Sequence, residues 1–238
     1  MKTAICFTGT CRSLQYTHEN IKNNLIDSVG ECDIFSFLVD NPHAYKFEKY
    51  FGHTSQVKKV LIEKEPEFDI SKMRFRPNWP LATSSRQIYI KMIKSRQRCI
   101  SVLEDYEQEN SVVYDRIIFS RLDVKYFEPV SPHLENIGHE YLYIPDFHNT
   151  FGGVINGYND RFAVGNRDDM LSYFNTPDSI EQFNATGGEI SAEILLKWHL
   201  IHNEVCVDKV PIRFTRVRAD GEEIDSRLKN MFLEPRDT

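Results

Sequence analysis

Residues Thr3–Arg12, TAICFTGTCR, decide the expected fold of this chain. Their first five residues form an apolar run typical of a buried strand, and the threonine–glycine–threonine that follows ends the run with turn chemistry. Apolar residues then recur every four positions, at Ile21, Leu25 and Val29, which is the spacing of one buried helix face. The start of the chain therefore predicts a strand, a turn and a helix in succession.

The same alternation continues along the chain. Further strands are predicted at Asp33–Val39, Val57–Ile62, Arg116–Phe119, Tyr141–Ile144 and Arg161–Val164, and further helices at Ser85–Tyr106 and Glu189–Leu200. Between them, residues 63–80 are expected to form a long surface loop, because charges and three prolines interrupt the periodicity. Strands that alternate with helices favour an α/β fold, with a central, mainly parallel sheet and helices on both faces. Ligands of such sheets collect at the carboxyl ends of the strands.

The composition is that of an ordinary globular domain. Of the 238 residues, 41% are hydrophobic and 27% are charged, which is typical of a chain that buries a core. The formal net charge of −6 argues against a sequence-independent grip on nucleic acid. No apolar run approaches the roughly 20 residues of a membrane span, and the first residues lack the pattern of a signal peptide. We therefore expect a single domain over residues 1–238 in the cytoplasm, or in the host cytoplasm for a viral protein.

The cysteines agree with that location. They are odd in number and form neither a CxxC pair nor a zinc-ribbon spacing; they stand at Cys6, Cys11, Cys32, Cys99 and Cys206. Reduced thiols that pack as small apolar side chains are expected, in preference to a disulfide framework or a metal site.

The turn after the first strand is the first candidate site. Thr8, Gly9, Thr10 and Arg12 combine a glycine that permits a tight turn, hydroxyl groups that can bond a nucleotide, and a guanidinium group that can meet a phosphate. The pattern is neither GxGxxG nor a Walker A loop, which disfavours dinucleotide and P-loop chemistry. A plain strand-to-helix turn with a solvated Arg12 is the alternative, and these residues taken alone favour it.

A second candidate lies in Tyr114–Val124, YDRIIFSRLDV. Arg121 and Asp123 stand two residues apart at the carboxyl end of the predicted strand and hence on one face. A carboxylate there can hold Mg²⁺ or Mn²⁺ against a diphosphate, because both ions prefer oxygen ligands. An Arg–Asp pair that only closes the end of the strand explains the same residues equally well.

A third candidate follows a run of glycines. Gly152, Gly153 and Gly157 are typical of a mobile loop that lets backbone approach a ligand. Asp160 and Arg161 then place two charges directly before a short apolar strand. The alternative is a salt bridge at the entry of that strand, worth ~1 kcal/mol or less if exposed.

Taken in order, these segments resemble GT-A-type glycosyltransferases, above all the bacterial and viral enzymes that decorate surface glycans. The shared features are a G-x-x-R turn, a D-x-F strand, a helix ending in Y-E, a YD-apolar-R-x-D strand, an NDRFA-x-G block, a helix with an early glutamate, and an R-x-R-x-D-G segment. In this chain they lie at Gly9–Arg12, Asp33–Phe35, Tyr106–Glu107, Tyr114–Asp123, Asn159–Gly165, Glu189 or Glu193, and Arg216–Gly221. Each motif is short, so the likeness, which runs from Lys2 to about Gly221, depends on their order and spacing.

The resemblance implies a hexosyl- or pentosyltransferase. Such an enzyme moves a sugar from a nucleotide diphosphate donor, a UDP-sugar by family frequency, to a hydroxyl of a glycan or glycoconjugate. The nucleotide-binding half would cover about residues 1–125 and the acceptor-side half about 126–238. Asp123 would bind Mn²⁺ or Mg²⁺ as part of the D-x-D motif of the family. Arg121 replaces the first carboxylate of that motif, so the strictness of the metal requirement is left open.

The resemblance also assigns the nucleotide to residues 8–12, with Arg121 and Asp123 at the diphosphate. Asp40 ends the second predicted strand and Arg86 opens the longest helix, so both are expected beside the nucleotide. The loop Gly152–Tyr158 is expected to move without the donor and to close over it.

An inverting enzyme also needs a carboxylate base near the acceptor hydroxyl. Asp160, Glu189 and Glu193 are the candidates for this catalytic role. Glu189 and Glu193 are four residues apart and would share one face of the predicted helix. Acids that merely complement the dipole at the start of that helix are the alternative.

Two other functions stay open. A nucleotidyltransferase uses a similar sheet, but it usually carries a glycine-rich, basic loop after its first strand, and Gly9–Arg12 is sparse by comparison. A non-catalytic module that binds a sugar or a nucleotide also fits these residues. The sequence does not fix the donor sugar, the acceptor, retention or inversion, or the oligomeric state, including whether the protein is a homodimer.

Overall fold

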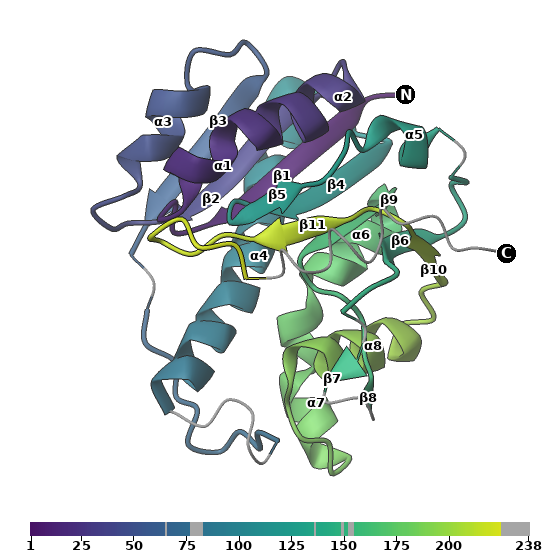
Figure 1. Ribbon diagram of the computed structural model, residues 1–238. Helices are drawn as coiled ribbons and strands as arrows, with labels where there is room; N and C mark the ends of the chain where they lie inside the picture. Colours follow the sequence, from purple (N-terminus) through teal and green to yellow (C-terminus); the bar gives the residue numbers. More distant parts are fainter. Residues whose placement is uncertain (65, 77–82, 136, 149, 152–154, 225–238) are drawn as a thin grey trace, which may run out of the picture.

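The fold is taken from a computed structural model of the chain, which describes residues 1–64, 66–76, 83–135, 137–148, 150–151 and 155–224. At its centre lies a seven-stranded sheet with the order β10-β6-β9-β4-β1-β2-β3 (Figure 1). Its strands are β1 (Thr3–Gly9), β2 (Asp33–Val39), β3 (Val57–Glu63), β4 (Arg116–Arg121), β6 (Leu142–Pro145), β9 (Phe162–Asn166) and β10 (Val207–Val210). Two short ribbons accompany it, β5 (Val124–Tyr126) with β11 (Phe214–Arg216), and β7 (Thr150–Phe151) with β8 (Ile155–Asn156).

Helices cover the sheet. The first helical stretch is α1 (Leu14–Ile21), the π-turn η1 (Lys22–Ile26) and α2 (Asp27–Val29) without a break. The others are α3 (Tyr45–Phe51), α4 (Thr83–Asn110), α5 (Ser131–Leu134), α6 (Arg167–Phe174), the 3₁₀ turn η2 (Thr176–Ser179), α7 (Ile180–Ala185) and α8 (Ala192–His202). Within the described residues, no helix is long and apolar enough to cross a membrane.

The two faces of the sheet bury different side chains of the same strands. On β1, Ile5 and Phe7 pack with α1 and α3 on one face, whereas Ala4 and Cys6 pack with α4, α6 and α8 on the other. This alternation follows from the two-residue period of a strand. The predicted α/β fold with helices on both faces of the sheet is therefore confirmed.

The sheet is mainly parallel, as predicted. β1 pairs in parallel with β2 and β4, β2 with β3, and β6 with β10. The exception is β9, which runs antiparallel to both of its neighbours, β4 and β6. In the β1–β4 register Thr8 lies opposite Arg121. The carboxyl ends of β1, β2 and β4 therefore meet at one edge.

The predicted strands are all present, with bounds that differ by a few residues. The last predicted helix begins later than expected, at Ala192, because Ile190 forms a parallel bridge with Phe75 instead of a first helical turn. That bridge anchors the segment predicted as a long loop over residues 63–80. Glu63 still belongs to β3, residues 64 and 66–76 contain no helix or strand beyond this contact, and residues 77–80 lie outside the described residues. Four of the five cysteine thiols are buried, as expected for small apolar side chains, whereas Cys206 is exposed.

Candidate functional site

A cavity of about 840 Å³ opens at the carboxyl ends of β1, β2 and β4. The turn Thr8–Arg12 forms one wall, and α4 contributes Ile88, Met92 and Ser95 to another. Arg121 and Asp123 lie between these walls, at the end of β4. The cavity thus occupies the edge of the sheet where the parallel strand order predicts a ligand.

The turn at the end of β1 contains two residues with positive φ angles, Gly9 and Cys11. Gly9 has a φ of +143°, which side-chain-bearing residues rarely adopt, so glycine permits the sharp exit from the strand. Cys11 follows with a φ of 55°. Thr10 accepts a hydrogen bond on Oγ1 from Arg12 Nε at 3.0 Å, which holds the exposed guanidinium group over the turn. All four residues predicted here, Thr8, Gly9, Thr10 and Arg12, line the cavity.

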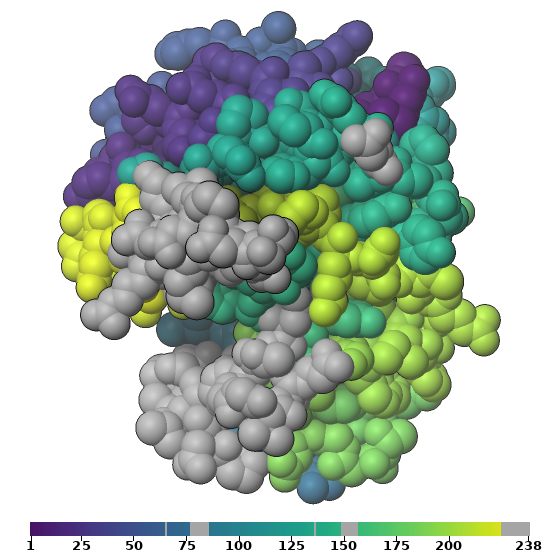
Figure 2. Space-filling view, turned by 45° about the vertical axis from the view of Figure 1, so that its right-hand side comes forward, coloured from purple at the N-terminus to yellow at the C-terminus, as the bar shows by residue number. Residues whose placement is uncertain are grey.

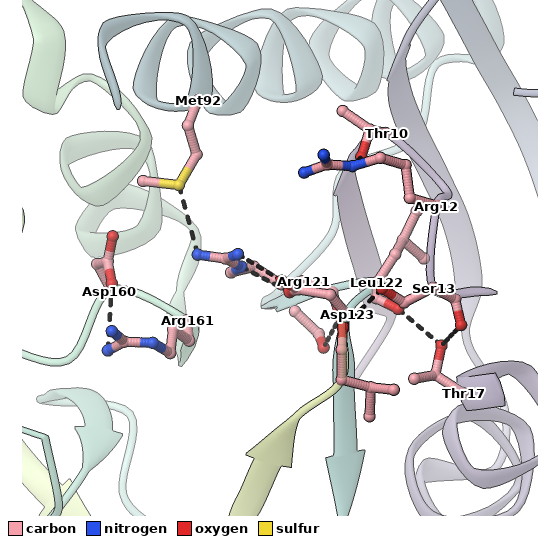
Figure 3. A network of polar contacts seen from close by, with 12 residues as sticks. Thr10, Arg12, Ser13, Thr17, Met92, Arg121, Leu122, Asp123, Asp160 and Arg161 are labelled. Atoms are coloured by element: carbon pink, nitrogen blue, oxygen red, sulfur yellow. Dashed lines mark hydrogen bonds and ion pairs between the residues drawn. The ribbon is translucent and has the colours of Figure 1, made fainter. Parts of the chain in front are cut away.

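Arg121 and Asp123 form a two-pronged ion pair in the cavity wall (Figure 3). Arg121 donates from Nε to Asp123 Oδ1 at 2.8 Å and from Nη2 to Asp123 Oδ2 at 2.6 Å. Its remaining Nη1 points to Met92 Sδ at 3.5 Å. Burial alone would raise the pKa of Asp123, but Arg121 above all, with Arg216 and Arg161, brings this pKa below its ordinary value. The carboxylate is therefore ionised and held by guanidinium groups.

Arg12 reaches the same space from the neighbouring strand. In Figure 3 its guanidinium group and that of Arg121 both lie beneath α4, on the side of the strand ends that faces the cavity. Because Thr8 pairs with Arg121 across β1 and β4, the two arginines are brought together by the sheet register. Guanidinium groups match the geometry of phosphate oxygens. The geometry therefore suits a phosphorylated ligand.

The segment Val217–Glu222, which we call the C-terminal strap, forms a further wall of the cavity although it lies about 200 residues after the turn Thr8–Arg12 in the sequence. Val217 accepts a hydrogen bond on its backbone oxygen from Ser13 Oγ at 2.6 Å and donates its N–H to Asp123 O at 2.8 Å. Figure 2 shows the end of the described chain, in yellow, on the surface against the purple N-terminal part. The strap adds Arg218, Asp220 and Glu222 to the wall. The sequence motif R-x-R-x-D-G gave no reason to expect these side chains at the nucleotide.

Two predicted residues lie outside the cavity wall. Asp40 is exposed, and its neighbours Val39 and Asn41 line the cavity in its place. Arg86 lies on α4 with its guanidinium group over the ring of Phe75, 5.1 Å from the ring centre. Of the α4 residues in the cavity wall, Ile88 is 64% exposed.

Asp160 and Glu193 lie in a separate buried group beside the cavity, which we call the acid–arginine cluster and which also contains Arg161 and Arg96. Arg161 lies between the two acids, with Nη1 3.5 Å from Asp160 Oδ1 and Nη2 3.6 Å from Glu193 Oε1. The side chains of Asp160, Arg161 and Glu193 are only 3%, 11% and 10% exposed. Arg96 donates from Nη1 to Asp160 O at 3.3 Å and to the Tyr173 hydroxyl at 3.1 Å.

The acid–arginine cluster separates the proton affinities of its two acids. For Asp160, burial would raise the pKa, but Arg161, Arg96 and Arg121 lower it below the ordinary value. For Glu193, burial and the charge of Asp160 raise the pKa, and Arg161 only partly offsets them. Environments that push two carboxyl groups apart in this way are typical of acid and base assignments in enzymes.

The cluster adjoins the cavity through the backbone. Arg121 donates its N–H to Arg161 O at 3.2 Å, which joins the ends of β4 and β9. The cluster's side chains do not belong to the wall of the cavity. The sequence placed Arg161 beside Asp160 in the third candidate site but gave it no role, and it gave no signal for Arg96.

Glu189 is not part of this cluster. Its side chain is 43% exposed and lies 3.9 Å from Arg74. The prediction that it shares a helix face with Glu193 is wrong, because α8 begins at Ala192, after the bridge made by Ile190. Of the two glutamates, Glu193 alone belongs to the first turn of α8.

The predicted glycine loop can be assessed at one end. Residues 152–154 lie outside the described residues, so the expected motion of Gly152–Tyr158 stays a prediction. Gly157 packs directly on α8, where an added Cβ would fall 2.4 Å from Glu193 Cβ. Tyr158 donates its N–H to Glu193 O at 2.9 Å. The end of the loop therefore fixes the position of Glu193.

A divalent cation does not fit the environment of Asp123. Each carboxylate oxygen already accepts a short hydrogen bond from Arg121, and the charges that act most strongly on the group are guanidinium groups. Mg²⁺ and Mn²⁺ prefer sites where oxygen ligands gather, as carboxylates do. The expected role of Asp123 as a metal ligand stays a prediction that this donor set does not favour.

The comparisons with known proteins give a family but no function. The sequence model of a family described as "Domain of unknown function (DUF7796)" matches residues 1–219. The match includes the whole central sheet, Arg12, Arg121 and Asp123, and it ends within the C-terminal strap. No curated protein matches the chain. The resemblance to GT-A-type glycosyltransferases stays a prediction.

Proposed function

The chain belongs to the DUF7796 family, whose function is unknown, and from the geometry of its own cavity we propose that it is a glycosyltransferase. It moves a sugar from a nucleotide diphosphate donor, a UDP-sugar, to a hydroxyl of a glycan acceptor. The finer assignment of the α/β fold as GT-A-like belongs to the same proposal. The free state of all five thiols supports a cytoplasmic location.

One observation carries this proposal. Arg12 and Arg121, from the ends of two neighbouring parallel strands, border the same cavity of about 840 Å³. This volume lies within the range of sites that hold small ligands and cofactors. Two guanidinium groups in one wall suit a diphosphate, which offers several oxygen acceptors and negative charge.

The walls suggest how the donor lies. The diphosphate is placed between Arg12 and Arg121, and the nucleoside extends along the segment that follows β2, where Asn41, Pro42 and His43 line the cavity. The sugar then faces the end of β9 and the acid–arginine cluster, because Arg161 is joined to Arg121 through the backbone. This placement leaves the acceptor on the side of Asp160 and Glu193.

The transfer needs one bond to break and one to form. The bond between the anomeric carbon and the phosphate oxygen breaks, and its electron pair leaves with UDP. The acceptor oxygen bonds to the anomeric carbon and gives up its proton to a carboxylate, for which Asp160 and Glu193 are the candidates. Arg12 and Arg121 face the oxygens on which negative charge develops, so they stabilise the leaving group.

A product assay tests the proposal. The purified chain is incubated with UDP-hexoses and UDP-pentoses, with water or a mixture of glycans as acceptor, and the released products are measured. We expect UDP from at least one donor, and we expect Arg121→Gln to abolish the release. Arg98→Gln is the matched control, because Arg98 also pairs with a carboxylate outside the cavity: its Nη2 donates to both oxygens of Glu63 at 3.1 Å.

The other outcomes of the assay are equally specific. Pyrophosphate in place of UDP, on incubation with UTP and sugar phosphates, would identify a nucleotidyltransferase. UDP-sugar binding without release of UDP from any donor would identify a binding module. Either result would contradict the proposed transfer.

A further inference from the structure

The ion pair between Arg121 and Asp123 has a consequence for how a diphosphate is held. Resting on the proposed function, we propose that the guanidinium groups of Arg121 and Arg12 bind the diphosphate directly and neutralise the leaving UDP, so that no divalent cation is required. Asp123 is then a positioning residue, whose carboxylate fixes Arg121, and not a metal ligand.

The first support is the bonding of the Asp123 carboxylate. Both of its oxygens accept from one guanidinium group, at 2.8 and 2.6 Å, which is the geometry of a strong two-pronged pair. A cation at this carboxylate would have to displace Arg121. The displaced guanidinium group would then lie next to a doubly charged ion, and like charges at such distances repel.

The second support is the charge of the surroundings. Besides Arg121, the groups that lower the pKa of Asp123 are Arg216 and Arg161. Arg12 and Arg218 add two further positive charges to the cavity wall. The strap also adds Asp220 and Glu222 to that wall. The charges that act most strongly on Asp123 are nevertheless guanidinium groups, which repel a second cation at this carboxylate.

The third support is the set of N–H donors that remains for a ligand. A guanidinium group carries five N–H donors. Arg121 directs one at each oxygen of Asp123, and its Nη1 faces Met92 Sδ at 3.5 Å. A thioether sulfur is a weak acceptor, so a phosphate oxygen can take its place without the loss of a strong bond. Arg12 donates from Nε to Thr10, and among the residues that the structure describes its other nitrogens make no hydrogen bond.

This arrangement supplies the chemistry that the transfer needs. As the anomeric carbon–oxygen bond breaks, its electron pair stays on the phosphate oxygen of UDP. Fixed N–H donors aimed at that oxygen stabilise the charge without reorganisation. Asp123 holds Arg121 in place, and the hydrogen bond from Arg12 Nε to Thr10 Oγ1 holds the second guanidinium group over the turn, so both positive charges are placed before the ligand binds.

The first experiment uses the unaltered full chain. Binding of UDP is measured by calorimetry in EDTA and again with Mn²⁺. We expect dissociation constants that agree within about threefold. Binding that is more than about threefold tighter with Mn²⁺, or that needs Mn²⁺, would overturn the inference but leave the proposed function standing. Absence of UDP binding under both conditions would overturn the proposed function and the inference with it.

The second experiment separates the two roles of Asp123. In EDTA, Asp123→Asn keeps the size of the side chain and one oxygen acceptor, and we expect it to bind UDP within about threefold of the parent. Arg121→Gln removes a charged contact and should weaken binding about 10- to 100-fold. Arg98→Gln should bind like the parent, and thermal unfolding of each variant verifies its fold. Loss of UDP binding in a folded Asp123→Asn protein, with Arg121→Gln unchanged, would show that Arg121 does not hold the diphosphate and would overturn the inference.

Discussion

At position 121 an arginine stands where the predicted resemblance to GT-A-type glycosyltransferases would place a carboxylate, and its partner is the aspartate two residues later. The sequence predicted both side chains on one face of a strand. The structure brings them together differently, because β4 ends at Arg121 and Asp123 lies in the turn before β5. Their pairing could not be predicted, because a free Asp123 and a paired one have the same spacing. The choice between them depends on the arginines that the fold brings near.

The acid–arginine cluster shows the same limit more strongly. Asp160 and Arg161 are neighbours in the sequence, and their order suggests a pair. Glu193 contacts Arg161 because the first turn of α8 lies beside the start of β9. Arg96 reaches the cluster from α4. The sequence predicted Asp160 and Glu193 as candidates, but their burial and their shared arginine depend on tertiary packing.

The opposite pKa directions of the two acids predict opposite pH dependences of stability. Glu193 holds its proton more tightly in the folded state, so its contribution is fully present below the ordinary carboxyl pKa and is lost as the pH rises through the raised value. Glu193→Gln cannot ionise. The free energy of unfolding of this variant, relative to the parent, should therefore rise as the pH increases above the ordinary carboxyl pKa, by about 1.4 kcal/mol for each tenfold difference in proton affinity between the folded and unfolded states.

Asp160→Asn is the counterpart in the same experiment. The pKa of Asp160 is lowered, so its contribution is present above the ordinary carboxyl pKa and is lost as the pH falls. This variant should lose stability relative to the parent as the pH rises from about 2 to 5. Urea unfolding at a series of pH values measures both. Parallel pH dependences of the two variants would contradict the assignment of proton affinities.

Among the elements, the strands with the clearest apolar runs were predictable and the short ones were not. β1, β2 and β4 are buried on both faces and appear in the sequence as continuous apolar runs. β5 and β11 have only three residues each, and the residues that pair between them lie about ninety positions apart in the sequence. Their pairing depends on the folded chain, and a local pattern does not contain it.

Strand direction is a second property that the sequence did not reveal. β9 has the same apolar pattern as the strands that pair in parallel, yet it runs antiparallel to both of its neighbours, β4 and β6. The period of the side chains is the same for both directions. Likewise Ile190, Ile194 and Trp198 have helical spacing, but the backbone of Ile190 bonds Arg74 and Arg76 before the helix begins.

The contact between the β8–β9 connection and α8 predicts a steric effect. Gly157→Ala would place a Cβ 2.4 Å from Glu193 Cβ and 2.7 Å from its backbone carbon. Because backbone must move, we expect a loss of about 1–3 kcal/mol in the free energy of unfolding. Gly165→Ala is the control, since the nearest atom to its Cβ would be Leu142 Cα at 3.4 Å. Equal stability of the two variants in urea would contradict the tight packing of this connection.

At the scale of the whole molecule, the sheet unites the two halves that the resemblance implies. β1–β4 come from the first half, and β6, β9 and β10 come from the second. The C-terminal strap then returns to the first half and closes the cavity. The alternation of elements predicts this α/β architecture. The return of the strap is a long-range contact that no local pattern encodes.

Some motif residues serve the fold of the whole chain. Glu107 accepts hydrogen bonds from Tyr114 N at 2.9 Å and from Arg167 Nη2 at 2.8 Å. It thereby ties the end of α4 to the start of β4 and to α6. This buried pairing gives Glu107, the second residue of the Y-E motif, a structural role away from the cavity.

The most direct test of the account is a crystal structure of the chain with UDP, grown in the presence of EDTA. The account predicts the diphosphate within hydrogen-bond distance of both Arg12 and Arg121, with Asp123 still paired to Arg121 and the nucleoside along Asn41–His43. UDP bound elsewhere on the molecule, or a diphosphate that contacts neither arginine, would contradict it.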